Sequence, residues 1–207
     1  MMPLDEMPDW LNVSRETEEK MRGLCDLVKK WNPAVNLVAK STIADLWQRH
    51  LLDSAQLYTY CPQDVRSWLD LGSGAGFPGL VIAILAEKQR PEMTVTLVES
   101  DRRKAVFLTE AARTLNLRAK VICERVESVQ PQAANVVSAR ALASLTALCE
   151  HAARHLGPDG LCLFPKGAAA AVEIAEARRV WHFKVETHGS RTDTNASILA
   201  LKEIRHA

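Results

Sequence analysis

A turn rich in glycine offers the clearest chemistry in this sequence. The segment GSGAG, residues 72–76, follows the apolar run SWLDL and precedes a second apolar run that begins near Leu80. Glycine adopts positive φ and lets a ligand lie directly against the backbone, and the free amides at the start of a helix favour an anionic group. The pattern predicts a strand, a turn and a helix that bind a small anionic cofactor. A tight turn without a ligand is the alternative.

Two cofactor classes fit this turn. Residues 74–79 match G-x-G-x-x-G, and Glu99 lies about where a dinucleotide-binding unit carries its acidic residue, so a nicotinamide cofactor is one candidate. The turn itself starts at Gly72, which gives D-x-G-x-G-x-G from Asp70 and favours S-adenosylmethionine. A nicotinamide enzyme would also need hydride-transfer residues such as Tyr-x-x-x-Lys, and both tyrosines, Tyr58 and Tyr60, precede the turn.

The elements around the turn change character near residue 63. In the first sixty residues apolar side chains recur at helical spacing from Met21 to Trp31, Pro33 is expected to interrupt the helix, and Thr42 with Asp45 predicts a capping box for the next one. From residue 67 short β-type runs alternate with helical runs. The extended runs cover residues 67–71, 94–99, 119–124, 134–139, 160–166, 181–189 and 196–204.

These runs predict an α/β fold. Strands that alternate with helices give a mostly parallel sheet with helices on both faces. The connection between the last two runs, SRTDTN, is too short for a crossover helix, so those two strands are expected to form an antiparallel hairpin. We expect a helical extension over residues 1–62, packed on an α/β domain over residues 63–207.

Composition limits the location and the partners. No run approaches the roughly 20 apolar residues of a membrane span, and the start is acidic rather than a secretion signal, so we expect a cytoplasmic protein without membrane contact. The net charge of +1 does not indicate a nucleic-acid partner, although residues 100–125 carry seven basic and three acidic side chains. Five cysteines without C-x-x-C spacing, and His151 and His155 without a third ligand, argue against a bound metal.

Six stretches together carry a resemblance that spans nearly the whole chain. They are WNPAVNLVA (31–39), RHLLDSAQL (49–57), LDLGSGAGFPGLVIAI (69–84), RVE (125–127), SARALASL (138–145) and PKG (165–167). In these stretches the chain resembles the RsmG family, also called GidB, of bacterial 16S rRNA methyltransferases. The resemblance implies a class I, Rossmann-like fold, S-adenosyl-L-methionine as the cofactor, and methyl transfer to N7 of one guanosine. The implied partner is 16S rRNA, as naked RNA, in an assembly intermediate or in the finished small ribosomal subunit.

The cofactor-binding residues follow from the strand ends and the resemblance. Glu99, with Ser100 beside it, is expected to accept hydrogen bonds from ribose hydroxyls, unless it is only an acidic residue at a helix start, a place that Asp101 could also fill. The resemblance implies that Val126 and Glu127 lie against the adenine, with a solvated charge cluster as the alternative. The whole expected set is Gly72, Ser73, Gly74, Gly76, Phe77, Glu99, Ser100, Val126, Glu127 and Arg140, in which Phe77 could instead be a core aromatic.

Arg140 is the expected catalytic residue. Guanine N7 carries a lone pair and no proton, so its methylation needs alignment rather than a general base. Residues 138–140 read SAR, without the Asn/Asp-Pro-Pro-aromatic motif of amino-group methyltransferases or the Pro-Cys pair of cytosine C5 methyltransferases. A guanidinium can hydrogen-bond guanine O6 or hold a phosphate, and because the methylated purine is cationic we assign Arg140 to positioning. A surface arginine at a strand end is the alternative.

Basic residues near the strand ends are the expected RNA contacts. They are Arg125, Lys166, Arg102 and Arg103, with Lys104 as a further candidate, and each could instead be a solvated charge. Asn36, His50 and Asp53 fit the family pattern and are expected to be structural. An RNA-binding module without enzymatic activity is the remaining rival to a methyltransferase. The oligomeric state is left open by the sequence.

Overall fold

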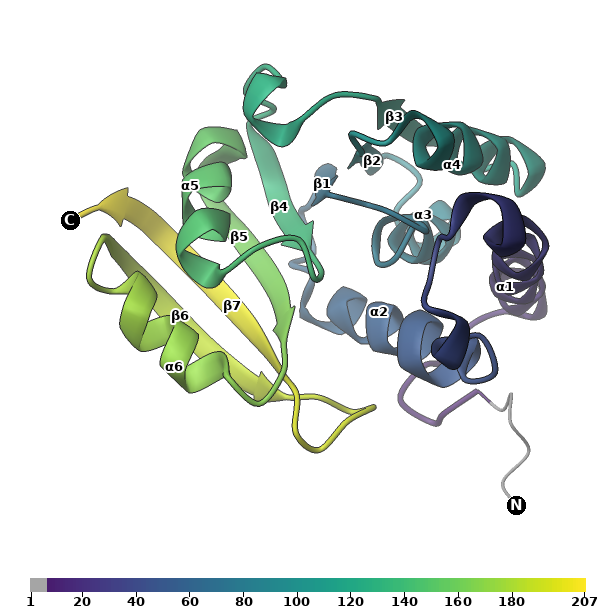
Figure 1. Cartoon of the computed structure of the whole chain (residues 1–207), viewed down its shortest axis with the longest axis horizontal. Helices are drawn as coiled ribbons and strands as arrows, with labels where there is room; N and C mark the ends of the chain where they lie inside the picture. Colours follow the sequence, from purple (N-terminus) through teal and green to yellow (C-terminus); the bar gives the residue numbers. More distant parts are fainter. Residues whose placement is uncertain (1–6) are drawn as a thin grey trace.

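The computed structural model describes residues 7–207, in which seven strands form one sheet flanked by helices (Figure 1). The strand order is β3-β2-β1-β4-β5-β7-β6, and β7 is the strand that runs antiparallel to both of its neighbours. This arrangement confirms the predicted mostly parallel sheet with an antiparallel final hairpin. The strands are β1 (Ser67–Leu71), β2 (Thr94–Val98), β3 (Ala119–Ile122), β4 (Ala134–Ala139), β5 (Leu156–Lys166), β6 (Trp181–Gly189) and β7 (Ser197–His206).

Helices cover both faces of the sheet, as the alternation of elements predicts. One apolar cluster joins the sheet to α3 (Gly79–Gln89) and α4 (Arg102–Thr114), and a second cluster joins it to α5 (Leu145–His155) and α6 (Ala170–Ala177). α3 is buried all along Gly79 to Ala86 because it lies between β2 on one side and the N-terminal helices on the other. An apolar helix without a polar face fits that enclosed position.

The N-terminal extension is helical and packs on α3 and α4. It consists of α1 (Arg15–Val35), η1 (Lys40–Thr42), the π-helical segment η2 (Trp47–Leu52), α2 (Asp53–Ala55) and η3 (Gln56–Tyr60). Met21, Leu24 and Val28 point from α1 into the first apolar cluster, as their helical spacing predicts. Residues 1–6 of the predicted extension lie outside the described residues, and its boundary at residue 62 stays a prediction.

Two local predictions in the extension are wrong. Pro33 does not interrupt α1, which continues to Val35 because the Asn36 amide still donates to the Asn32 carbonyl over 2.9 Å, with Asn36 left-handed at φ 54°. Thr42 forms no capping box, because its hydroxyl donates to the Ala39 carbonyl over 2.8 Å and the next helical segment begins only at residue 47. Within residues 7–207, no helix combines the length and the apolarity needed to cross a membrane.

Candidate functional site

The glycine-rich turn lies between β1 and α3, at the carboxyl edge of the parallel strands. Gly72, Gly74 and Gly76 all have positive φ, at 65°, 54° and 85°. At Gly74 an added Cβ would meet only the Gly72 carbonyl oxygen, at 3.8 Å, so the space beside this residue is open. The turn therefore presents a bare stretch of backbone against which a ligand can lie.

Asp70 closes the turn from beneath. Its carboxylate is fully buried and accepts hydrogen bonds from the Ser138 hydroxyl at 2.7 Å and from the Gly79 amide, at the start of α3, at 3.2 Å. Burial raises the pKa of Asp70 to about 6. The amide expected to bind an anionic cofactor is thus taken by the chain's own carboxylate. A dinucleotide pyrophosphate at this helix start would have to displace it, which disfavours the nicotinamide alternative.

Glu99 stands directly after β2 and is also buried, with 7% of its surface exposed. One carboxylate oxygen accepts from the Gly74 amide and the other from the Asp101 amide, both at 2.8 Å. Asp101 itself caps α4 by accepting from the amides of Arg103 and Lys104. Asp101, and not Glu99, is therefore the acidic residue that caps the start of α4. Each Glu99 oxygen keeps a further lone pair for a hydroxyl donor.

A cleft of about 280 Å³ lies over these groups, and we call it the glycine-loop cleft. It is lined by Gly72, Gly74, Val98, Glu99, Ser100, Lys104, Glu124, Arg125, Val126, Glu127, Ala141, Leu142 and His151. Six of the expected cofactor residues are in this lining. The other four, Ser73, Gly76, Phe77 and Arg140, are not in this lining. The Ser73 hydroxyl donates to the Asp70 carbonyl, Gly76 lies against Leu80, and Phe77 is 3% exposed, at the position of a core aromatic. Arg140 lines a different cleft.

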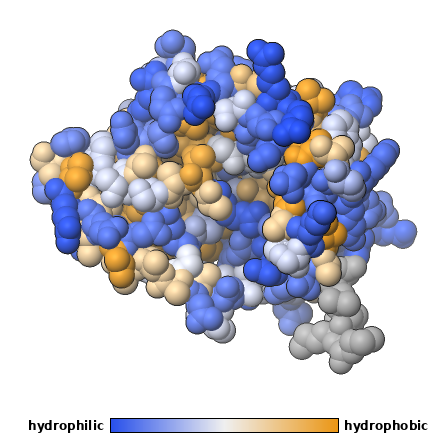
Figure 2. Space-filling view, in the orientation of Figure 1, coloured by the Kyte–Doolittle hydropathy of each residue, from blue (hydrophilic) through white to orange (hydrophobic). Residues whose placement is uncertain are grey.

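A larger cleft of about 900 Å³ adjoins the first, and we call it the arginine cleft. It is lined by Arg49, Asp53, Ala139, Arg140, Ala141, Leu142, Ala143, Leu148, Pro165, Lys166, Gly167, Glu173, Thr192, Asp193, Thr194 and Ala196. Ala141 and Leu142, in the loop after β4, line both clefts. Polar residues cover most of this face of the molecule, and apolar residues show in the hollow near its middle (Figure 2). Because Ala141 and Leu142 follow β4 and line both clefts, the two clefts meet at the end of this strand.

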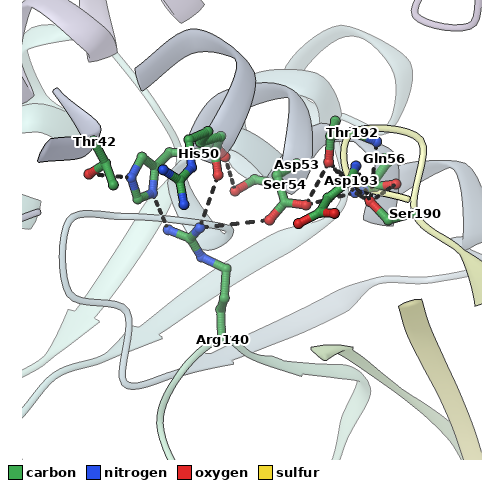
Figure 3. A network of polar contacts seen from close by, with 10 residues as sticks. Thr42, His50, Asp53, Ser54, Gln56, Arg140, Ser190, Thr192 and Asp193 are labelled. Atoms are coloured by element: carbon green, nitrogen blue, oxygen red, sulfur yellow. Dashed lines mark hydrogen bonds and ion pairs between the residues drawn. The ribbon is translucent and has the colours of Figure 1, made fainter. Parts of the chain in front are cut away.

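Arg140 extends from the end of β4 toward the N-terminal extension (Figure 3). Its guanidinium donates to His50 Nδ1 at 2.7 Å and to the Arg49 carbonyl at 3.4 Å, and it lies 3.7 Å from an Asp53 carboxylate oxygen. The side chain is 21% exposed and lies over the Phe77 ring at 5.7 Å. Burial lowers the pKa of Arg140, and the nearby Asp53 opposes that change. The Arg140 side chain is thus fixed by His50, Arg49 and Asp53 and lines a cleft, which argues against the alternative of an arginine exposed at the surface.

His50 and Asp53 are the partners that hold Arg140. Burial, together with the charges of Arg140 and Arg49, lowers the pKa of His50 to about 4, so its ring is neutral at pH 7. Burial raises the pKa of Asp53, although it accepts hydrogen bonds from Thr192 and Gln56, each at 2.9 Å. The sequence predicted structural roles for these two residues but no contact between them and Arg140.

The loop between β6 and β7 was missed as part of the site. Gln56 is fully buried and binds this loop, donating to Ser190 Oγ at 3.1 Å and accepting from the Arg191 amide at 2.8 Å (Figure 3). Thr192 and Asp193 then line the arginine cleft. The turn-rich composition of residues 190–195 predicted a connection, and no periodicity or motif marked it as a cleft wall. Asn36 lies elsewhere, at the end of α1.

The expected RNA-binding residues are divided between places. Arg102 and Arg103 are exposed at the start of α4, and Arg125 is exposed at the rim of the glycine-loop cleft. Lys166 lines the arginine cleft, but its ammonium binds Glu173 at 2.7 Å and the Ala143 carbonyl at 3.0 Å. Arg102 and Arg125 are exposed to solvent and can meet phosphates, whereas Arg103 lies 3.5 Å from an Asp101 carboxylate oxygen and Lys166 is bound by Glu173.

The histidine pair on α5 has other contacts. His155 is fully buried with Nε2 at 3.1 Å from the Val126 carbonyl oxygen, and His151 Nε2 lies 3.8 Å from a Glu127 carboxylate oxygen. Within the part of the chain that the structure describes, no three His, Cys, Asp or Glu side chains gather in a way that could hold a metal ion.

Comparison with known proteins identifies the family of this chain. Residues 17–198 match the family model of GidB, rRNA small subunit methyltransferase G. The ribosomal RNA small subunit methyltransferase G of Cereibacter sphaeroides is 56% identical over 196 residues, covering 95% of each chain, and that of Rhodospirillum centenum is 53% identical over 192 residues, covering 93% of this chain and 87% of the other. A SAM-dependent methyltransferase from Aquifex aeolicus shares the fold, with a TM-score of 0.59 at 12% identity over 86% of this chain and 97% of that one. The chain therefore belongs to the rRNA small subunit methyltransferase G family.

Proposed function

We propose that this chain transfers a methyl group from S-adenosyl-L-methionine to N7 of one guanosine in 16S rRNA. We place the reaction in the cytoplasm, on the small ribosomal subunit or an assembly intermediate. The observation that carries the proposal is the meeting of two clefts at the end of β4, with Arg140 beside their shared residues, Ala141 and Leu142. One cleft then holds the cofactor and the other the target nucleoside, and ligands of open α/β sheets gather at this strand edge.

The glycine-loop cleft fits S-adenosylmethionine in its donor set. The cofactor supplies an electrophilic methyl group on its sulfonium. The Glu99 carboxylate already accepts hydrogen bonds from the amides of Gly74 and Asp101, and its remaining lone pairs can accept hydrogen bonds from the ribose hydroxyls. The buried Val126 offers an apolar surface to the adenine. Gly74 supplies backbone without a side chain in the way. Glu127 is exposed at the same rim, where it can accept from the exocyclic amine.

The arginine cleft suits a nucleophile that needs no deprotonation. Ala141 and Leu142, which border both clefts, carry no proton-accepting side chain. Of the three carboxylates in the larger cleft, Asp53 and Glu173 are engaged by Arg140 and Lys166, and Asp193 accepts a hydrogen bond from the Asn195 amide at 2.9 Å. Guanine N7 attacks with its in-plane lone pair, so alignment supplies the catalysis. Of the five N–H donors of Arg140, those not used by His50 and Arg49 can bind guanine O6 or a phosphate.

Exposed arginines that could bind rRNA phosphates support the same arrangement. Arg125 lies exposed at the rim of the glycine-loop cleft and Arg102 and Arg103 lie exposed at the start of α4, where they can position the RNA without selecting a base. With a net charge of +1, the chain is not suited to strong nonspecific RNA binding. Recognition of the target therefore depends on the folded shape of the rRNA or on ribosomal protein.

The test is transfer of labelled methyl from S-adenosylmethionine to small subunits isolated from cells that lack this protein, followed by chemical cleavage at N7-methylguanosine. We expect label at one cleavage site, and none on subunits from cells that contain the protein. Label at another atom would refute the N7 assignment. If S-adenosylmethionine did not protect the chain against heating and no label appeared, the RNA-binding module would replace the methyltransferase.

A further inference from the structure

We infer that His50 is a positioning residue that fixes the orientation of Arg140 for methyl transfer, and this inference rests on the proposed function. His50 belongs to η2 in the N-terminal extension, 90 residues away from Arg140 in sequence, and its Nδ1 lies 2.7 Å from a guanidinium nitrogen. The family comparison and the cofactor site give His50 no role in the reaction. The geometry supplies one.

The direction of the hydrogen bonds determines the state of the ring. Arginine only donates, so Nδ1 must be the unprotonated nitrogen and Nε2 must carry the hydrogen. Nε2 lies 2.9 Å from Thr42 Oγ1, and the Thr42 hydroxyl donates to the Ala39 carbonyl over 2.8 Å. Arg140, His50, Thr42 and Ala39 thus form one chain of hydrogen bonds in which each donor has one acceptor. This chain selects a single tautomer and a single ring orientation.

Asp53 and the Phe77 ring limit rotation of the Arg140 guanidinium. Asp53, one helical turn after His50, places a carboxylate oxygen 3.7 Å from Arg140, and its other oxygen is held by Thr192 and Gln56 at 2.9 Å each (Figure 3). The Phe77 ring lies beneath, 5.4 Å from the His50 ring and 5.7 Å from the guanidinium carbon. Arg140 is therefore bounded on three sides, and His50 makes its shortest contact.

A mere space-filling role for His50 would give different results from a positioning role. A filler can be replaced by leucine with little loss, whereas loss of the acceptor frees Arg140 to turn toward Asp53 and away from the cleft. Asparagine can place its Oδ1 near the position of Nδ1 and accept from Arg140, so it retains part of the function. Thr42→Val keeps the volume but removes the acceptor for Nε2–H, which weakens the choice of tautomer.

The test compares His50→Leu, His50→Asn and Thr42→Val with the full wild-type chain. The matched control is His188→Leu, because His188 is a partly buried histidine that stacks on Tyr60 at 4.4 Å and lines neither cleft. We expect kcat for methyl transfer to fall at least tenfold in His50→Leu, with partial recovery in His50→Asn and no change in the control. The calorimetric Kd for S-adenosylhomocysteine should stay within about twofold in all variants, because His50 does not line the glycine-loop cleft.

A spectroscopic measurement separates this inference from the proposed function. The nitrogen NMR shifts of His50, assigned by comparison with His50→Asn, should show protonation at Nε2 alone in the wild-type chain without RNA. In Thr42→Val we expect mixed tautomers. Protonation at Nδ1, or unchanged kcat in a folded His50→Leu chain, would overturn the inference. If the wild-type chain transferred no methyl to N7 but showed the expected tautomer, the proposed function would fail while the geometry stood.

Discussion

Gly74→Ala tests directly whether the glycine-loop cleft holds the cofactor. At φ 54° an alanine is strained by about 1–2 kcal/mol, and its Cβ would meet no protein atom closer than 3.8 Å. The fold should therefore survive, with the melting temperature lowered by about 2–8 °C for a chain of this size. The new methyl group occupies space that the cofactor needs, and the strain also disturbs the amide that binds Glu99. Affinity for S-adenosylhomocysteine should fall at least tenfold, which is about 1.4 kcal/mol.

The assay is isothermal titration with S-adenosylhomocysteine, together with thermal unfolding in the absence and presence of the ligand. Gly189→Ala is the matched control, because no atom lies within 4 Å of its Cβ position and its φ is not in the left-handed region. That variant should bind and unfold like the wild-type chain. If Gly74→Ala bound the ligand with wild-type affinity, the cofactor would not lie against this turn, and the assignment of the two clefts would be wrong.

Four further predictions address the rest of the site. Gly79→Ala should lower stability by about 1–3 kcal/mol in denaturant titration, because its Cβ would overlap Leu97 Cδ2 and lie 2.7 Å from an Asp70 carboxylate oxygen. Arg140→Lys should keep the fold by circular dichroism but cut methyl transfer more than tenfold, since an ammonium cannot bind in the planar, forked geometry of a guanidinium. Arg102→Gln should reduce the salt dependence of RNA affinity by about 0.7–0.9 in log–log slope if this cation binds a phosphate. The pKa of His50 lies near 4 in the fold and near 6.5 when unfolded, so the unfolded chain binds the proton first and stability is lost as pH falls from about 6.5 to 4. Urea titrations across this window should show a loss on the order of 2 kcal/mol after solvent screening, and a smaller loss in His50→Gln.

The sheet and its cofactor side could be predicted because they depend on short-range patterns. Extended runs bounded by turns and alternating with helical runs give the parallel sheet, and residues that directly follow parallel strands must share one edge. Glu99 and Val126 therefore lie together in the glycine-loop cleft, and Arg140 lines the adjoining arginine cleft. Asp101, two residues from Glu99, took the helix-capping role that the sequence had left undecided.

Other features of the site depend on contacts between distant segments. Asp70 takes the amide at the start of α3, and it is held by Ser138, which lies opposite it only because β1 and β4 pair in that register. Phe77 follows the turn directly, but the N-terminal extension packs over it and makes it part of the core beneath Arg140. No local pattern in the sequence specifies either contact. A helix that tolerates Pro33 is a smaller case, because burial of α1 outweighs the one amide bond that proline removes.

The division of the site between two clefts explains how a widely shared fold can serve one rRNA position. The likeness to the Aquifex aeolicus structure, at 12% identity, extends to the fold of the sheet and its helices. The arginine cleft is lined by the N-terminal extension, the loop after β4 and the loop between β6 and β7, together with residues of α5, α6 and the end of β5. His50, Asp53 and Gln56 join these three segments through two hydrogen bonds and an ion pair, each between residues more than 80 positions apart in the sequence. Because the extension supplies His50 and Asp53, the partners of Arg140, it determines how the residue proposed to align the target base is held.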